Sequence, residues 1–123
     1  GTLTPNSKLD VNGDIAVAGM VVHASDARLK KDIRNVSAAL DKVSQLNGVT
    51  WAWKDNREPG TQMGVVAQDV EKVAPELVVE HDDGYKSVNY AGLNALTIEA
   101  IKELRAENVA LKRRLAKLEA VQP

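Results

Sequence analysis

A heptad repeat near the C-terminus limits most strongly what this chain can fold into. Residues in this stretch are spaced alternately three and four apart on one stripe, which predicts one long helix over about residues 91–119. A stripe this narrow is typical of a coiled-coil seam. Its a positions are Ile101, Asn108 and Leu115, and its d positions are Leu104, Leu111 and Leu118.

Charged residues beside the seam favour a parallel arrangement of helices. The g and e positions place Glu107 with Lys112 and Arg114 with Glu119, and both pairs are opposite in charge across a parallel interface. Residues 114–119 are also similar to the Arg-apolar-x-x-apolar-Glu signature associated with parallel trimers. Asn108 in the seam would fix its register. We expect a parallel homotrimer; the alternative is an amphipathic helix packed on its own domain.

The residues before this helix predict a mixture of helices and strands. Ser37 is a candidate N-cap for a helix that ends at Gly48, and Pro75 ends a second, shorter helix. The predicted elements are a helix with Leu40, Val43 and Leu46 on one face, a strand over 49–53, a turn at 58–60, a buried strand over 63–67, a helix around Val70 and Val73, and a hairpin over 77–88 that turns at 81–84.

Two features of this block suggest a ligand, and each has a simpler interpretation. Trp51 and Trp53 project to the same face of a strand, where packing in a core or subunit interface is favoured over a ligand platform. His81 with Asp82 and Asp83 suggests a metal, but a solvated turn is favoured because no second histidine is near in sequence. We therefore predict no metal site and no cofactor.

Residues 1–24 contain short apolar runs around Asn12-Gly13, a dipeptide that favours tight turns. Isolated hairpins are marginal in water, so this segment needs neighbours, for example the same segment of other chains. The alternative is a flexible leader. The segment lacks the basic flank and apolar run of a signal peptide, and we expect it to be an internal piece of a longer protein.

Composition excludes several classes of function. The 123 residues contain no Cys and no Phe, and the formal net charge is -1. Such a charge gives no reason to expect a nucleic acid or an anionic membrane as partner, and no apolar run approaches the roughly 18 residues of a membrane span. A thin core of Val, Leu, Ile and Ala makes association a natural way to bury the remaining apolar surface.

Several segments together resemble one known family. The stretch Ser25-Asp26-Ala27-Arg28-Leu29-Lys30-Lys31-Asp32-Ile33 is similar to the start of the C-terminal intramolecular chaperone domain of phage endosialidases and other tail spikes, the peptidase S74 family. Later segments fit the same family in the same order: 64–71, 75–78, and 87–90 leading into 99–104. The resemblance covers residues 25 to about 118. Asn89 stands where Asp is often expected.

The resemblance implies both a fold and an activity. We expect an α+β fold, in which residues 1–24 end a β-stalk of a triple β-helical fibre and residues 25–123 form the chaperone and autocleavage domain. Ser25 would be the nucleophile and Lys30 the base of a Ser/Lys dyad that cuts at Ala24–Ser25, with the bond after Ser25 as the alternative. A lysine amine with its ordinary pKa of about 10.4 is protonated at neutral pH, so a base of this kind must be desolvated.

The expected function is therefore folding of a fibre, followed by release. The domain would form a homotrimer, hold three copies of the upstream β-stalk of the same polypeptide in register, and then cut itself off. The product would be a phage tail fibre or spike, folded in the host cytoplasm and carried on the virion, from which the released domain is absent. The alternatives are a permanent trimerisation cap or adhesin tip that never cleaves, and a coiled-coil adaptor that binds a foreign helix.

Overall fold

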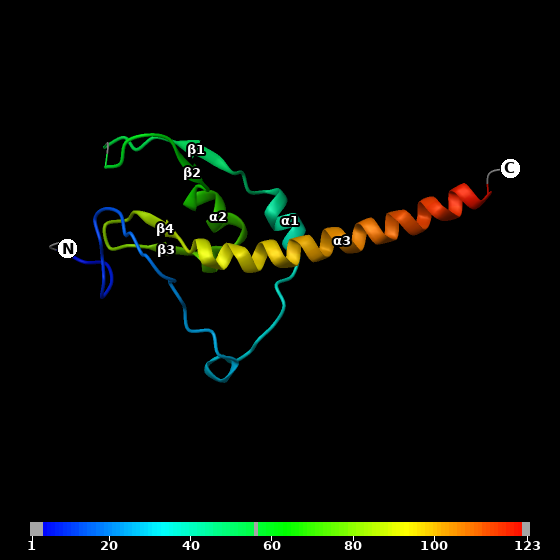
Figure 1. Cartoon of the computed structure of the whole chain (residues 1–123), viewed down its shortest axis with the longest axis horizontal. Coiled ribbons are helices and arrows are strands. Elements are labelled where there is room, and N and C mark those ends of the chain that lie inside the picture. The colour runs from blue at the N-terminus through cyan, green and yellow to red at the C-terminus, as the bar shows by residue number, and fades with distance from the viewer. Residues whose placement is uncertain (1–3, 56, 122–123) are drawn as a thin grey trace.

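One long helix, α3 (Tyr90–Val121), organises the fold, and the other helices and strands lie beside or beyond its N-terminal end (Figure 1). The computed structural model describes residues 4–55 and 57–121. The elements before α3 are, in chain order, the 3-10 turn η1 (Ala27–Leu29), α1 (Ala39–Ser44), β1 (Val49–Trp51), β2 (Gln62–Gly64), α2 (Ala67–Val73), the 3-10 turn η2 (Pro75–Leu77), β3 (Val78–Glu80) and β4 (Lys86–Val88). The fold is therefore α+β, with short strands and a dominant C-terminal helix.

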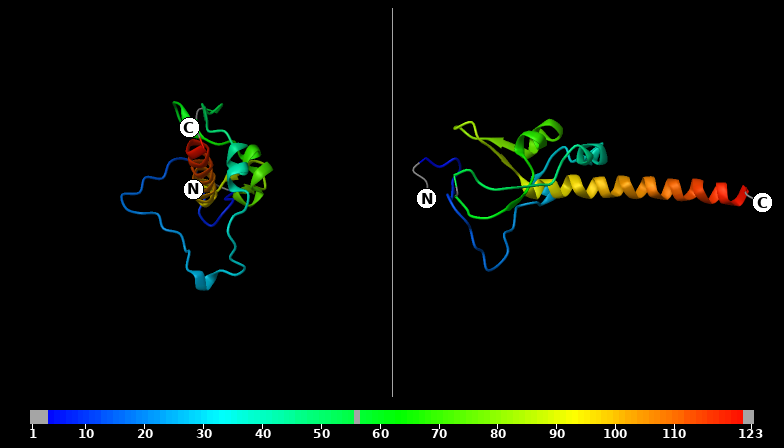
Figure 2. Two further views of the ribbon diagram at one scale, coloured as in Figure 1. Left: turned by 90° about the vertical axis from the view of Figure 1, so that its right-hand side faces the viewer. Right: turned by 90° about the horizontal axis from the view of Figure 1, so that it is seen from above.

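The start of α3 is defined by Asn89. Its side-chain Oδ1 accepts a hydrogen bond from the Gly92 N–H at 3.1 Å, which is the bond an N-cap asparagine makes. After Gly92 the helix contains no further glycine and no proline, and it is rich in Ala, Leu, Glu, Lys and Arg, which have high helix propensities. The predicted helix over about 91–119 is confirmed. Figure 2 shows that its C-terminal half extends well beyond the small domain.

The core lies where α1 packs against the N-terminal half of α3. Ala39 of α1 and Leu96 and Ala100 of α3 are buried at its centre. The half-buried residues around them are Val36, Leu40, Val43, Leu46 and Leu93. The predicted apolar face of the first helix is therefore confirmed, although the helix itself is short. A helix of this length is not stable alone in water, so packing against α3 holds it in place.

The N-terminus of α1 is capped by a side chain from α3. The backbone N–H groups of Ala39 and Leu40 donate to the two carboxylate oxygens of Glu103, at 3.1 and 2.6 Å. The prediction that Ser37 caps this helix is wrong. The residue before the helix is Ala38, whose φ of 50° is left-handed rather than the extended conformation of an N-cap, and its side chain provides no cap. The first N–H groups of α1 are instead bonded by Glu103, a residue that is distant in sequence.

Two antiparallel hairpins make up the strands. In the first, β1 pairs with β2, with Val49 opposite Gly64. In the second, β3 pairs with β4, with Val78 opposite Val88. The predicted hairpin over 77–88 is confirmed, and its turn places Gly84 at a φ of 83°, which glycine adopts without strain.

A second, smaller cluster lies under the β3–β4 hairpin. Val70 and Ala74 are buried there, and Lys86 of β4 forms an ion pair with Glu71 of α2. The predicted helix around Val70 is confirmed, since α2 ends just before Pro75.

The predicted buried strand before α2 is wrong in extent and burial. It ends at Gly64, and the Met63 side chain is 81% exposed. A two-stranded hairpin has one face without cover, and Met63 points to that face.

The tryptophans of the first hairpin pack on each other. The rings of Trp51 and Trp53 lie edge to face at 5.8 Å, and the guanidinium of Arg57 lies 4.8 Å above the Trp53 ring. Both tryptophans are half-buried. Their bulk is thus used for packing within the hairpin.

Residues 4–24 form neither a helix nor a strand in the single chain. They run as an extended segment past the tips of the two hairpins and then away from the domain (Figures 1 and 2). The expected β-stalk needs strands from three chains, so it stays a prediction. Residues 1–3 of that expected stalk, and residues 122–123 of the expected domain, lie outside the described residues.

The close approach between Gly64 and Tyr90 generates the first prediction. The Tyr90 hydroxyl bonds the N–H of Val65 at 3.1 Å and its carbonyl at 3.3 Å, and a methyl group on Gly64 would collide with that hydroxyl. Gly64→Ala should therefore lower the free energy of unfolding by about 1–3 kcal/mol, the usual cost of overpacking. Chemical denaturation measures it. Gly48→Ala is the matched control, because no atom lies within 4 Å of its added methyl, and an equal loss there would contradict the clash.

The cap on α1 generates the second prediction. Glu103→Ala leaves two helix N–H groups without their acceptor and should cost about 1–2 kcal/mol of unfolding free energy, as loss of an N-cap does. Glu99→Ala is the control one turn earlier, since Glu99 forms a surface ion pair with Lys102 of the same helix, and such pairs contribute little. If both variants unfold at the same denaturant concentration, Glu103 is not an important cap.

Candidate functional site

Ser25 and Lys30 lie on either side of the 3-10 turn η1. Asp26 begins this turn: its Oδ1 accepts the Arg28 N–H at 2.9 Å, and its carboxylate also bonds the Arg28 guanidinium. The Leu29 N–H donates to the Asp26 carbonyl and the Lys30 N–H to the Ala27 carbonyl, both at 3.1 Å. The turn is therefore built from bonds between near neighbours in sequence.

This turn brings the two predicted dyad residues together. The Nζ atom of Lys30 donates a hydrogen bond to the Oγ atom of Ser25 at 2.7 Å. The Ala24–Ser25 peptide bond directly precedes the serine. A serine hydroxyl in contact with an amine has the geometry of a nucleophile and its base, provided that the amine can lose its proton.

Asp26 and Arg28 are fixed to each other rather than to the dyad. The bond from the Arg28 side chain holds the pKa of the Asp26 carboxyl below its ordinary value, and the Arg28 backbone N–H adds to this effect. The carboxylate therefore stays ionised, and its two oxygens are occupied by Arg28. The Lys30 side chain is left to bond the Ser25 hydroxyl.

The site is exposed in the single chain. Ser25 and Lys30 are both exposed, and the loop that carries them projects away from the hairpins and α3 (Figures 1 and 2). The apolar side chains nearest in sequence, Val21, Val22, Leu29 and Ile33, are exposed as well. Exposed apolar residues around a polar pair suit contact with another surface, and such contact would remove water from the amine.

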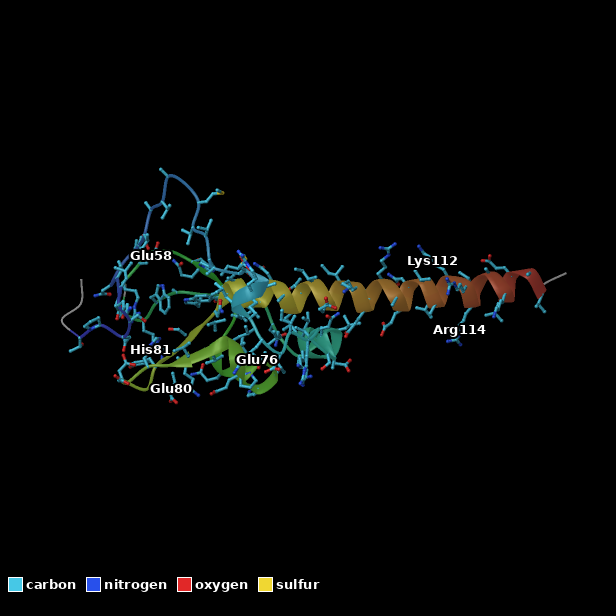
Figure 3. The ribbon with its side chains drawn as sticks, turned by 90° about the horizontal axis from the view of Figure 1, so that it is seen from below. Glu58, Glu76, Glu80, His81, Lys112 and Arg114 are labelled. Carbon is cyan, nitrogen blue, oxygen red and sulfur yellow. The ribbon has the colours of Figure 1, made fainter. Side chains whose placement is uncertain are left out.

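The predicted coiled-coil seam forms a second candidate site. Its five apolar residues, Ile101, Leu104, Leu111, Leu115 and Leu118, are between 46% and 66% exposed, and Asn108 is exposed. Every residue from Leu104 to Val121 is exposed. Lys112 and Arg114 project from opposite sides of this uncovered half of α3 (Figure 3). The seam is therefore free to contact other helices.

Three functional contacts escaped the sequence analysis. Glu103 caps α1 from 64 positions away in the chain, and no local pattern indicates such a contact. Asp26 caps η1, and an Asp two residues before an Arg in a turn was a signal available in the sequence. The His81 Nε2 lies 2.7 Å from the Ser87 Oγ across the β3–β4 hairpin, where the sequence favoured a solvated turn over a metal site.

The described residues contain neither a cluster of metal-binding side chains nor a helix that could span a membrane. Within residues 4–55 and 57–121, no group of three or more acidic or histidine side chains is placed to hold a metal ion. In the same part of the chain, no helix is both long and apolar enough to cross a membrane.

The chain matches a known protein family over part of its length. Residues 25–79 match the family Peptidase_S74, described as chaperone of endosialidase. The matched segment begins at Ser25 and includes Lys30, so the Ser25–Lys30 contact lies inside it.

Curated relatives include phage fibre proteins. The chain is 37% identical over 107 residues to Long tail fiber protein Gp37 of Salmonella phage S16, a match of 80% of this chain and 14% of that protein. It is 38% identical over 98 residues to the protein of the same name from Enterobacteria phage K3, covering 74% of this chain and 8% of that protein. A more distant relative, 27% identical over 124 residues, is Myelin gene regulatory factor-like A of Dictyostelium discoideum, covering 92% of this chain and 13% of that protein. The chain thus spans a small fraction of the length of these relatives.

Proposed function

Through residues 25–79 this chain belongs to the family of endosialidase chaperones, and from that premise we propose that it is an intramolecular chaperone that aligns three copies of an upstream fibre and then releases itself. The observation that carries the release step is the 2.7 Å contact between Lys30 Nζ and Ser25 Oγ. The phage fibre relatives support a virion fibre as the product.

Trimerisation begins with the uncovered half of α3. Its seam would bury five apolar residues against two other helices, while Glu107 and Arg114 at g positions pair with Lys112 and Glu119 at e positions. Asn108 at an a position sets the register. Parallel helices bring the three upstream segments to the same end of the bundle.

Alignment of three chains is the physical problem that this bundle solves. A β-stalk made of repetitive short strands pairs almost as well when one chain slips along another. Holding the three chains together raises their effective concentration and fixes their relative position. Residues 4–24, which form no strand in the single chain, would then pair with their copies.

The release step uses the Ser25 hydroxyl as nucleophile. Its oxygen attacks the carbonyl carbon of Ala24, and the neutral Lys30 amine takes the hydroxyl proton. That proton passes to the Ser25 nitrogen as the Ala24–Ser25 amide bond breaks, which leaves an ester between Ala24 and the Ser25 oxygen. Water then cleaves the ester, giving the Ala24 carboxylate, a free Ser25 hydroxyl and a new amino terminus at Ser25.

Assembly would control this chemistry. In the single chain both dyad residues are exposed, and water favours the ammonium form of an amine, which cannot accept a proton. Neighbouring chains that cover Val21, Val22, Leu29 and Ile33 would also exclude water from Lys30. Cleavage would thereby follow correct folding.

The dyad generates the third prediction, to be tested in the chain joined to its upstream fibre. Intact mass spectrometry should show wild type split at Ala24–Ser25; a split after Ser25 differs by one serine. Ser25→Ala should abolish cleavage. Lys30→Ala should slow it by about 100- to 10,000-fold, the usual contribution of a general base. Lys30→Arg should fail as well, because a guanidinium stays protonated.

Lys31→Ala is the matched control, because this neighbouring lysine is exposed and has no role in the proposed step. All variants should remain trimers. Cleavage at full rate in the Lys30→Ala protein would eliminate the dyad. A wild type that stays uncut with its fibre attached would instead support the permanent trimerisation cap.

The seam generates the fourth prediction. Sedimentation equilibrium should give three times the chain mass for wild type and one chain mass for the double variant Leu111→Asp with Leu115→Asp. Each lost leucine alone costs about 2–5 kcal/mol, and each aspartate adds a charge to an apolar interface. Ala106→Asp with Ala120→Asp places the same charges on the outer face and should stay trimeric. A wild type that sediments as a monomer or stable dimer would overturn the trimer.

A further inference from the structure

The N-terminal third of α3 carries an exposed apolar residue that neither the core nor the seam uses. Ile98 is 57% exposed, and in the heptad that runs through Ile101 it occupies an e position. It follows Leu96, a buried core residue, by two positions, which is about 200° around a helix. Ile98 therefore points almost directly away from α1 of its own chain.

The α3 residues that pack against α1 fall at two positions of the heptad. The α3 residues that contact or surround α1 are Leu93 and Ala100 at g positions, and Leu96 and Glu103 at c positions. The domain thus packs on the g and c side of α3, about a quarter turn from the seam. The a and d positions stay free for other chains.

In a parallel bundle the g side of one helix lies beside the e side of the next. Leu93 of one copy is then next to Ile98 of the neighbouring copy, and Ala100 is next to the neighbouring Arg105. Beyond this region the corresponding pairs are charged, beginning with Glu107 and Lys112. The apolar pair, Leu93 with Ile98, thus lies at the level of α1 and its core, and the mixed pair of Ala100 with Arg105 precedes the fully charged pairs.

The charges at this junction are complementary. The N-terminus of α1 carries two carboxylates, Asp41 in its first turn and Glu103 as its cap. The e side of α3 carries Arg105 at the same level along the helix, while Lys102 beside it pairs with Glu99 of its own helix. A neighbouring helix would bring Arg105 toward the two acids.

From these placements we propose that α1 of each copy lies in the groove between its own α3 and the α3 of the next copy, where Ile98 and Arg105 of that copy cover Leu93 and other half-buried residues around the core. The inference rests on the proposed parallel trimer and adds an interface outside its seam. It makes the small domain part of the subunit contact. The residues around the core, which are half-buried in the single chain, would then be buried further by association.

The direction of α1 indicates which residue meets Ile98. The first residues of α1 lie beside Glu103 of α3. The chain then runs toward β1, which lies near the N-terminal end of α3 (Figure 1). The last residue of α1, Ser44, is exposed and should lie near the level of Ile98. Within one chain the body of α3, about 10 Å across, separates Ile98 from α1.

Cross-linking tests the arrangement cleanly because the sequence contains no cysteine. The double variant Ser44→Cys with Ile98→Cys is treated with a short bifunctional maleimide and run on a denaturing gel. Sedimentation equilibrium of the same protein checks that it is a trimer. Ser44→Cys with Lys112→Cys is the matched control, since Lys112 is an e position 14 residues further, about 21 Å along the helix. Leu118→Cys, in the seam, shows that the reagent links neighbouring chains.

The expected result is covalent dimers and trimers for the Ser44 and Ile98 pair, and single chains for the Ser44 and Lys112 pair. A trimer in which the Leu118 variant is linked but the Ser44 and Ile98 pair is not would overturn the inference and leave the proposed function standing. A monomer for wild type and variants alike would overturn the proposed trimer, and this interface with it.

Discussion

Packing of α1 across α3, with the Glu103 carboxylate bonded to the first N–H groups of α1, is the contact on which the rest of the structure depends. A helix of six residues does not form alone, because the cost of nucleation exceeds the few hydrogen bonds gained. Burial of Ala39 against α3 and the hydrogen bonds to Glu103 stabilise this short helix.

Two sides of the long helix α3 have different surroundings. One side of its N-terminal half is buried by α1, around Leu96 and Ala100, and a different side carries the seam from Ile101 onward. The domain thus covers α3 without covering the seam. In the single chain the seam remains apolar and exposed, which is unfavourable in water and favours association. This geometry would allow the small domain and the proposed bundle to form together, since they use different sides of α3.

The contact between Ser25 and Lys30 illustrates how local and assembled structure would contribute separately to the proposed reaction. A 3-10 turn capped by Asp26 is enough to place Lys30 against Ser25, and it needs no contact from the rest of the domain. The proposed reaction also requires a neutral amine. The turn alone does not provide it, because an amine in contact with water favours its charged form. In the proposed function the atoms are arranged by the turn, and their reactivity depends on the surface that covers Val22, Leu29 and Ile33.

Features governed by residues close in sequence could be predicted without the structure. The long helix, the β3–β4 hairpin with its glycine turn, and α2 with its end at Pro75 all follow from periodicity and turn chemistry within short windows. The proximity of Ser25 and Lys30 belongs to the same class, because a single turn joins them. The family resemblance, rather than spacing alone, identified that pair.

Features that depend on distant parts of the chain could not be predicted in this way. Ser37 had the chemistry of an N-cap, but the left-handed backbone at Ala38 left the helix to be capped by Glu103. Met63 alternated like a strand residue facing a core, yet no element covers that face of its hairpin among the described residues. The sequence by itself determined where α3 begins and ends and which stripe it offers to other chains, since both depend on neighbours within a few turns. Only the tertiary structure decided which side of α3 holds α1, because that choice depends on side chains about sixty residues apart meeting in space.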